Sequence, residues 1–173
     1  MKKAVFLDRD GVINKAIVKN GIPYSPMNLN SVEIIFGVKD SLKALRDADW
    51  MTIVVTNQPD VARGKISKKE IEKINTYMKN TLPINEFYTC FHDNNDLCEC
   101  RKPKPGALTL AAKKNNIDLN CSYMIGDRWK DIEAGKRAGC KTIFINYFYK
   151  EKQPTDYTFQ VKSLSEAIKI ILG

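Results

Sequence analysis

The chain has 173 residues, a length that favours one domain built around one core. Hydrophobic residues make up 43% and charged residues 28%, the composition of an ordinary globular protein, and no apolar run approaches the roughly 20 residues of a membrane span. The net charge of +8 fits a protein that binds nucleic acid or phosphorylated substrates, but the lysines are spread along the chain, which favours a solvated surface. Lys2 and Lys3 precede an apolar run that is too short for a signal-peptide core, so we expect a cytoplasmic protein.

Predicted strands and helices alternate along the chain. The strands are short apolar or β-branched runs, expected over residues 2–7, 51–55, 87–91, 123–125 and 142–145. The helices carry apolar residues at a spacing of three or four, expected over residues 38–45, 71–78, 107–114, 132–138 and 164–171. Two helices are expected to begin with capping boxes, at Ser67 with Glu70 and at Ser163 with Glu166.

This alternation predicts an α/β fold, a three-layer Rossmann-like parallel sheet with helices on both faces. Residues 14–31 contain Gly21, Pro23 and Pro26 and are expected to be irregular. The segment is too short for a separate cap domain, so we interpret it as a loop on the substrate side.

Polar residues follow four of the predicted strands. Asp8, Thr56, Lys102 and Asp127 each lie at or just after the carboxyl end of a strand. Ligands of open parallel sheets bind at this edge, so we expect the four side chains to meet there.

Asp8 and Asp10 are two carboxylates two residues apart, and like charges that close need a cation between them. Mg²⁺ with a substrate phosphate meets this need, because Mg²⁺ is usually held by one or two carboxylates and phosphate oxygens. Asp8 could then attack phosphorus as a nucleophile. Asp10 could protonate the leaving oxygen and later deprotonate water.

The other strand ends supply phosphate and metal ligands. Thr56 and Asn57 offer a hydroxyl and an amide to phosphate oxygens, and Lys102 offers a positive charge. Asp127 is a further metal ligand, and Asp131 on the following helix could support it.

A second cluster consists of Cys90, His92, Cys98 and Cys100. Three thiolates and one imidazole suit a closed tetrahedral Zn²⁺ site, which has no open position and is therefore structural. A disulfide is a poor explanation, because the cysteines number five and the expected compartment is reducing.

Four stretches resemble the motifs of the haloacid dehalogenase superfamily of phosphatases: VFLDRDGVIN at 5–14, VVTNQ at 54–58, CRKPKPG at 100–106 and MIGDRWKDIEAG at 124–135. The resemblance covers nearly the whole chain. It implies that Asp8 is phosphorylated, that Asp10 is the acid and base, and that Thr56 and Lys102 hold the phosphoryl group. It also implies that Asp8, the backbone carbonyl of Asp10 and Asp127 bind magnesium.

Residues 90–100, which contain the expected zinc ligands and are called the zinc loop below, resemble particular groups within this superfamily. Cys-x-His followed by Cys-x-Cys-Arg-Lys-Pro is similar to the D,D-heptose 1,7-bisphosphate 7-phosphatases and to the related histidinol-phosphate phosphatases, both capless members. The resemblance implies a single phosphatase domain over residues 1–173 with this loop inserted. It also implies that Arg101 and Arg128 contact the substrate, with Gln58 in a pocket-lining loop. For the heptose enzymes the setting is nucleotide-activated heptose synthesis for lipopolysaccharide, capsule or a surface-layer glycan.

The sequence indicates the substrate less clearly than it indicates the type of reaction. The heptose enzymes commonly have Ser-Gly after Thr-Asn-Gln, where this chain has Pro59 and Asp60. Arg63, Arg101 and Arg128 would make the pocket cationic, which suits a bisphosphate sugar. Asp60 would instead suit the cationic amine of histidinol phosphate.

Two further alternatives remain open. The net charge would fit a nucleic-acid 3′-phosphatase, which needs a basic groove and stacking aromatics. A non-catalytic, zinc-stabilised binding module would leave Asp8, Asp10 and Asp127 unexplained. We expect a phosphorylated sugar as the substrate, no nucleic-acid or membrane partner, and a monomer.

Overall fold

The computed structural model describes all 173 residues. Its centre is a six-stranded parallel sheet with the strand order β5-β4-β1-β6-β7-β8. The strands are β1 (Ala4–Leu7), β4 (Met51–Asn57), β5 (Glu86–Cys90), β6 (Tyr123–Gly126), β7 (Lys141–Ile145) and β8 (Phe159–Val161). Along the chain, β4 and β5 are added on one side of β1, and β6, β7 and β8 are then added on the other side. The direction in which the connections run therefore reverses beside β1. The carboxyl ends of β1 and its neighbours therefore border a crevice suited to ligands.

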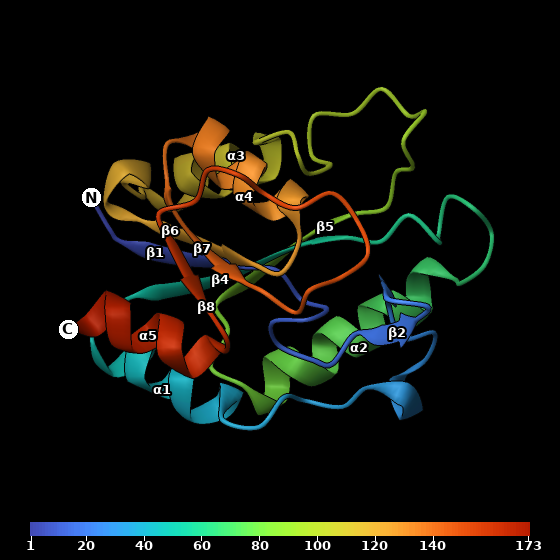
Figure 1. Cartoon of the computed structure of the whole chain (residues 1–173), viewed down its shortest axis with the longest axis horizontal. Coiled ribbons are helices and arrows are strands. Elements are labelled where there is room, and N and C mark those ends of the chain that lie inside the picture. Colours follow the sequence, from blue (N-terminus) through green and yellow to red (C-terminus); the bar gives the residue numbers. More distant parts are fainter.

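Helices cover both faces of the sheet, as the sequence predicts (Figure 1). The helices are α1 (Val38–Asp47), α2 (Lys68–Thr81), α3 (Gly106–Asn115), α4 (Trp129–Ala138) and α5 (Leu164–Leu172), with short 3₁₀ turns η1 (Leu29–Ser31) and η2 (Leu119–Cys121). Helices α3 and α4 lie on one face, and α1, α2 and α5 lie on the other. None of these helices combines the length and the apolar character needed to cross a membrane.

Strand β1 divides the core in two. Its alternate side chains point to opposite faces, so Val5 and Leu7 pack in the cluster with α1, α2 and α5, while Ala4 and Phe6 pack with α3 and α4. All four side chains are 0% exposed. Burying the larger ones contributes about 1.5–3 kcal/mol each, which anchors the strand that ends at Asp8.

The prediction of irregular structure over residues 14–31 was wrong for residues 17–24. Strands β2 (Ile17–Lys19) and β3 (Ile22–Tyr24) form an antiparallel hairpin there. Its turn is Asn20-Gly21, with φ of 54° and 80°. Asn-Gly is the pair that a tight type I′ hairpin turn favours, so the sequence contained this signal, although the flanking strands are very short.

The two capping boxes form only in part. The hydroxyls of Ser67 and Ser163 accept hydrogen bonds from Glu70 N and Glu166 N, both at 3.2 Å. The glutamates do not return the bond to their serines, because Glu70 accepts from Leu29 N at 3.1 Å and Glu166 from Lys162 N at 2.8 Å. Helix α2 is thereby tied to the segment that follows the hairpin.

Candidate active site

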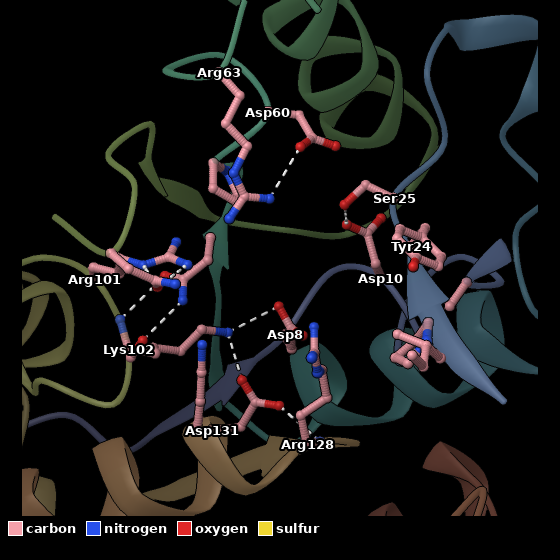
Figure 2. A pocket seen from close by; sticks show the side chains of 17 residues that line it. Asp8, Asp10, Tyr24, Ser25, Asp60, Arg63, Arg101, Lys102, Arg128 and Asp131 are labelled. Atoms are coloured by element: carbon pink, nitrogen blue, oxygen red, sulfur yellow. Dashed lines mark hydrogen bonds and ion pairs between the residues drawn. The ribbon is translucent and has the colours of Figure 1, made fainter. Parts of the chain in front are cut away.

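The ends of β1, β4 and β6 and the loop after β5 border one pocket of about 230 Å³. Among its 17 lining residues are nine candidate functional residues from the sequence: Asp8, Asp10, Asn57, Asp60, Arg63, Arg101, Lys102, Arg128 and Asp131. Thr56, Gln58 and Asp127 are buried and do not line it. Figure 2 shows the acidic side chains Asp8 and Asp131 around the Lys102 ammonium, with Arg101 on one side and Tyr24 on the other.

Lys102 binds the two carboxylates directly. Its Nζ donates to Asp8 Oδ1 at 2.8 Å and to the Val55 carbonyl at 2.7 Å, and it lies 2.7 Å from Asp131 Oδ1. Burial, then the Asp131 charge, raise the pKa of Asp8 to about 7, against the opposing effect of Lys102. Burial alone would lower the pKa of Lys102, but the Asp131 and Asp8 carboxylates raise it above its ordinary value, so the ammonium stays charged.

Three carboxylates gather behind this lysine. Asp8, Asp127 and Asp131 each offer an oxygen, and these oxygens lie within 4.8 Å of one another. Burial, then the Asp8 and Asp131 charges, raise the pKa of Asp127 well above its usual range. Asp127 Oδ1 is buried and has no hydrogen-bond partner. A divalent cation would compensate these charges and satisfy this oxygen, so the residues fit Mg²⁺.

The cluster adds one side chain to the expected magnesium ligands. Asp131, expected to support the site, offers an oxygen alongside Asp8 and Asp127, whereas the Asp10 side chain lies outside the cluster and its backbone carbonyl stays the expected ligand. Gly11, with φ of 90°, packs against the cluster. A Cβ there would lie 1.9 Å from Asp127 Oδ2, so no larger residue fits without displacing that carboxylate.

Asp10 is held by four neighbouring side chains. Its oxygens accept hydrogen bonds from Arg9 Nε at 3.1 Å, Asn14 Nδ2 at 3.0 Å, Ser25 Oγ at 2.7 Å and Gln58 Nε2 at 2.9 Å. Burial acts to raise the pKa of Asp10, but the Arg9 charge and these hydrogen bonds together hold it below its ordinary value. Ser25 follows the β2–β3 hairpin and lines the pocket, so the hairpin region contributes to its wall.

Two residues predicted to contact substrate also hold other site residues. The Gln58 side chain is 1% exposed, and its Nε2 donates to Asp10 and to Thr56 Oγ1, the latter at 2.9 Å. The Asn57 side chain donates to the Lys102 carbonyl at 2.9 Å and accepts from Lys102 N at 3.1 Å. Asn57 thereby fixes the backbone of the lysine that binds Asp8.

The outer wall of the pocket is cationic. Arg101 hydrogen-bonds to neutral groups only, with its Nη1 at 3.1 Å from the His92 carbonyl and its Nη2 at 2.9 Å from Asn94 Oδ1. Arg128 pairs with Glu151, its Nε lying 2.9 Å from Oε1. Lys130 also lines the pocket, and burial followed by the Arg101 and Arg128 charges lower its pKa.

Arg63 pairs with two acids, Asp60 and Asp93, at the rim of the pocket. Arg63 Nη1 lies 3.2 Å from Asp60 Oδ1, and its Nη2 lies 2.7 Å from Asp93 Oδ1. Asp60, the unexpected acid in the second motif, therefore already has a cationic partner.

The cysteine and histidine cluster lies at the start of the loop that carries Arg101 and Lys102. Cys90 Sγ lies 3.5 Å from His92 Nδ1 and 3.9 Å from Cys98 Sγ, and Cys100 Sγ lies 3.4 Å from His92 Nδ1. Around a tetrahedral Zn²⁺ with Zn–S of about 2.3 Å and Zn–N of about 2.0 Å, the ligand atoms would be about 3.5–3.8 Å apart. The donor set and its spacing therefore fit zinc.

The chain is similar to several known enzymes. The D-glycero-β-D-manno-heptose-1,7-bisphosphate 7-phosphatase of Haemophilus ducreyi is 36% identical over 153 residues, which cover 82% of this chain and 81% of that protein. The chain belongs to this family of the haloacid dehalogenase superfamily. A Photorhabdus laumondii protein named for the α anomer is 32% identical over 98% of this chain and 96% of its own length. The HAD-hydrolase-like family model matches residues 99–166.

A solved structure shares the fold. The D,D-heptose 1,7-bisphosphate phosphatase of B. bronchiseptica, complexed with magnesium and phosphate, superposes with a TM-score of 0.81 over 98% of both chains at 24% identity. The fold is therefore that of this superfamily, as predicted, and family membership makes the chain a hydrolase of phosphate monoesters.

Sequence reasoning missed several residues of the site. Ser25 and Lys130 line the pocket, and the fully buried Arg9 bridges Asp10 and Asn75. The signal for Arg9 was its place in the sequence between Asp8 and Asp10. Tyr149, whose hydroxyl donates to Asp127 Oδ2 at 2.9 Å, lies outside the four motifs, and nothing in the sequence indicated this contact.

Proposed function

We propose that the protein is a Mg²⁺-dependent phosphatase that removes the 7-phosphate of D-glycero-D-manno-heptose 1,7-bisphosphate through an aspartyl-phosphate. Its place would be nucleotide-activated heptose synthesis in the cytoplasm. The domain would span residues 1–173, with the zinc loop at 90–100 inserted. The active form would be a monomer.

Asp8 is the proposed nucleophile. Both hydrogen bonds that it accepts, from Arg9 N and from Lys102 Nζ at 2.8 Å each, reach Oδ1. Oδ2 is thus the oxygen that can form the bond to phosphorus as the ester P–O bond breaks. Thr56 and Lys102 would bind the phosphoryl oxygens. Asp8, Asp127 and Asp131 would hold Mg²⁺, which lowers the repulsion between the phosphate and the carboxylates.

Asp10 is the proposed acid and base. In the free protein its four donors and lowered pKa favour the charged form, which suits the second step, where Asp10 takes a proton from the water that attacks phosphorus. The first step needs a proton on Asp10 for the leaving oxygen. The negative charge of a bound phosphate raises the pKa of a nearby carboxyl and so favours uptake of that proton.

The cationic outer wall is the observation that carries the choice of substrate. Arg101 bonds only neutral groups, and Lys130 is crowded by cations, so both charges are available to a second anion. The second phosphate of a bisphosphate sugar would supply that anion. Asp60 is already paired with Arg63, which weakens the case for the amine of histidinol phosphate.

The test is phosphate release with Mg²⁺ from both anomers of heptose 1,7-bisphosphate, histidinol phosphate and a 3′-phosphorylated oligonucleotide, with Asp8→Asn as the blank. Both anomers are needed because relatives are named for each. One heptose anomer should have a kcat/KM that is higher by orders of magnitude than that of histidinol phosphate or the oligonucleotide. A win for histidinol phosphate or for the oligonucleotide would refute the substrate assignment, and activity in Asp8→Asn would refute the nucleophile.

A further inference from the structure

Tyr149 connects a distant loop to the carboxylate cluster. It lies between β7 and β8, is 9% exposed, and donates its hydroxyl to Asp127 Oδ2 at 2.9 Å. The proposed reaction uses no group from this loop. A buried tyrosine that ends on a buried carboxylate nevertheless needs a reason, because the same hydroxyl would be well hydrated in water.

The contact determines how the Asp127 carboxylate is turned. Oδ2 takes the tyrosine hydroxyl, and the carboxylate packs so closely on Gly11 that a Cβ there would lie 1.9 Å from Oδ2. Oδ1 is left buried and without a partner in the cluster with Asp8 and Asp131. One oxygen is therefore committed to the protein, and the other remains for a ligand.

The loop holds Tyr149 in place from several sides. Its carbonyl accepts from Gln153 Nε2 at 2.9 Å, and the next residue, Lys150, donates its N–H to the Gly21 carbonyl in the hairpin turn at 2.8 Å. Phe148 has a φ of 56°, which non-glycine residues rarely adopt, and its side chain is 81% exposed. This kink turns Phe148 outward while its neighbour Tyr149 reaches inward, and such backbone strain tends to be kept where it serves a site.

We propose that Tyr149 is a positioning residue, which holds Asp127 in the orientation that binds Mg²⁺. The proposal rests on the proposed function, since it takes Asp127 as a magnesium ligand. A carboxylate that is free to rotate loses conformational freedom when it binds a metal, whereas one already fixed by a hydrogen bond does not. Partners of metal ligands typically change metal affinity by about 10–100-fold when they are removed.

The experiment measures Mg²⁺ binding to the zinc-loaded, substrate-free protein by titration calorimetry. Tyr149→Phe keeps the ring and removes only the hydroxyl. Tyr147→Phe is the matched control, because its ring lies 5.6 Å from that of Tyr149 but its side chain is 40% exposed and its hydroxyl makes no hydrogen bond to Asp127. Asp127→Asn tests the metal site itself.

Tyr149→Phe should raise the Kd for Mg²⁺ about 10-fold, and Tyr147→Phe should leave it within about twofold of wild type. The Mg²⁺ concentration for half-maximal activity should move by the same factor, while kcat at saturating Mg²⁺ returns close to wild type. A residue with a merely structural role would instead lower the melting temperature of the metal-free protein and leave the Kd unchanged.

An unchanged Kd in Tyr149→Phe, with binding lost in Asp127→Asn, would overturn the role of Tyr149 and leave the proposed function intact. Wild-type protein that binds no Mg²⁺, or Asp127→Asn that binds as tightly as wild type, would overturn the metal site, and the role of Tyr149 with it.

Discussion

The Nζ of Lys102 lies 2.8 Å from Oδ1 of Asp8, and both side chains are buried. This ion pair joins the loop after β5 to the end of β1. It commits one oxygen of the proposed nucleophile and leaves the other free. The same ammonium lies 2.7 Å from Asp131, so a single lysine compensates two of the three clustered acids.

Replacing Lys102 should therefore damage both turnover and stability. Lys102→Met keeps most of the side-chain volume but leaves Asp8 and Asp131 buried without a cation. Removing one partner of a buried ion pair costs on the order of 3–5 kcal/mol. Urea unfolding at pH 8 without Mg²⁺ should show a loss of this order, and kcat should fall to the level of Asp8→Asn.

Added Mg²⁺ should restore part of the lost stability of Lys102→Met, because a cation would again lie among the carboxylates. Lys104→Met is the control, since Lys104 is paired with the exposed Glu99 at 3.0 Å. Equal stability of Lys102→Met and wild type would contradict the compensating role of the lysine.

Asp10→Asn should separate the two chemical steps. The variant keeps the shape of Asp10 but can neither give nor take a proton, and general acid–base catalysis contributes about 10²–10⁴-fold. Turnover of a sugar phosphate should fall by this factor. With p-nitrophenyl phosphate, whose leaving group needs little protonation, a burst of one nitrophenolate per chain should precede slow turnover.

The absence of that burst, with phosphoenzyme also undetectable, would argue against Asp10 as the base of the second step. Ser25→Ala, which removes one of the four hydrogen bonds to Asp10, should have a much smaller effect on turnover than Asp10→Asn.

The sequence predicted the parts of the molecule that depend on local patterns. The apolar runs located β1, β4, β5, β6 and β7, and the polar residues after them located the pocket. Strand β8 (Phe159–Val161) was missed because three residues, two of them exposed, have no detectable periodicity. Helix α4 begins three residues before the predicted start because Asp131 Oδ2 accepts from Arg128 N at 3.0 Å, and a side-chain cap of this kind is invisible to apolar spacing.

The sequence predicted which residues form the site, but not which residues they contact. Gln58 and Asn57 were expected to contact substrate, and their type is correct for that role. Their partners, Asp10 and the Lys102 backbone, lie in the segments after β1 and β5, so only the tertiary fold reveals that both amides already make these hydrogen bonds. The contact between Tyr149 and Asp127 spans 22 residues and could not be inferred for the same reason.

Loss of the proposed zinc ion should weaken substrate binding, because the loop that would hold the zinc also carries Arg101. Wild-type protein purified without chelators should contain about one zinc per chain, which removal of Mg²⁺ leaves in place. Cys98→Ser should lose this zinc and melt at a lower temperature. A loss of ~2 kcal/mol in the free energy of unfolding would lower the melting temperature by about 4–8 °C in a protein of this size. KM should rise because Arg101 is held by the His92 carbonyl within the loop.

Cys121→Ser is the matched control for Cys98→Ser. Cys121 is an exposed free cysteine outside the cluster, so this variant should keep its zinc, melting temperature and KM. Metal analysis that finds no zinc in the wild type, or full zinc in Cys98→Ser, would show that the four residues do not form a zinc site.

The stability of the Mg²⁺-free protein should fall as the pH rises from about 4 to about 7. Burial, then the Asp131 charge, raise the pKa of Asp8 from 3.8 to about 7, so the folded protein keeps a proton that the unfolded chain releases near 3.8. Stability decreases with pH wherever the folded state binds more protons. The contribution is fully present below 3.8 and is lost as the pH rises through the folded-state pKa. Asp127 shifts in the same direction.

Urea unfolding between pH 5 and 8, with zinc retained and Mg²⁺ removed by gel filtration, measures this slope. Asp8→Asn should flatten it, whereas Asp40→Asn, at an exposed position in α1, should follow the wild type. Mg²⁺ competes with the proton for the same carboxylates, so its affinity should rise across the same pH range. A wild-type slope identical to that of Asp8→Asn would mean that Asp8 is already ionised at pH 5. The Lys102 ammonium would then outweigh burial in setting the charge of the nucleophile.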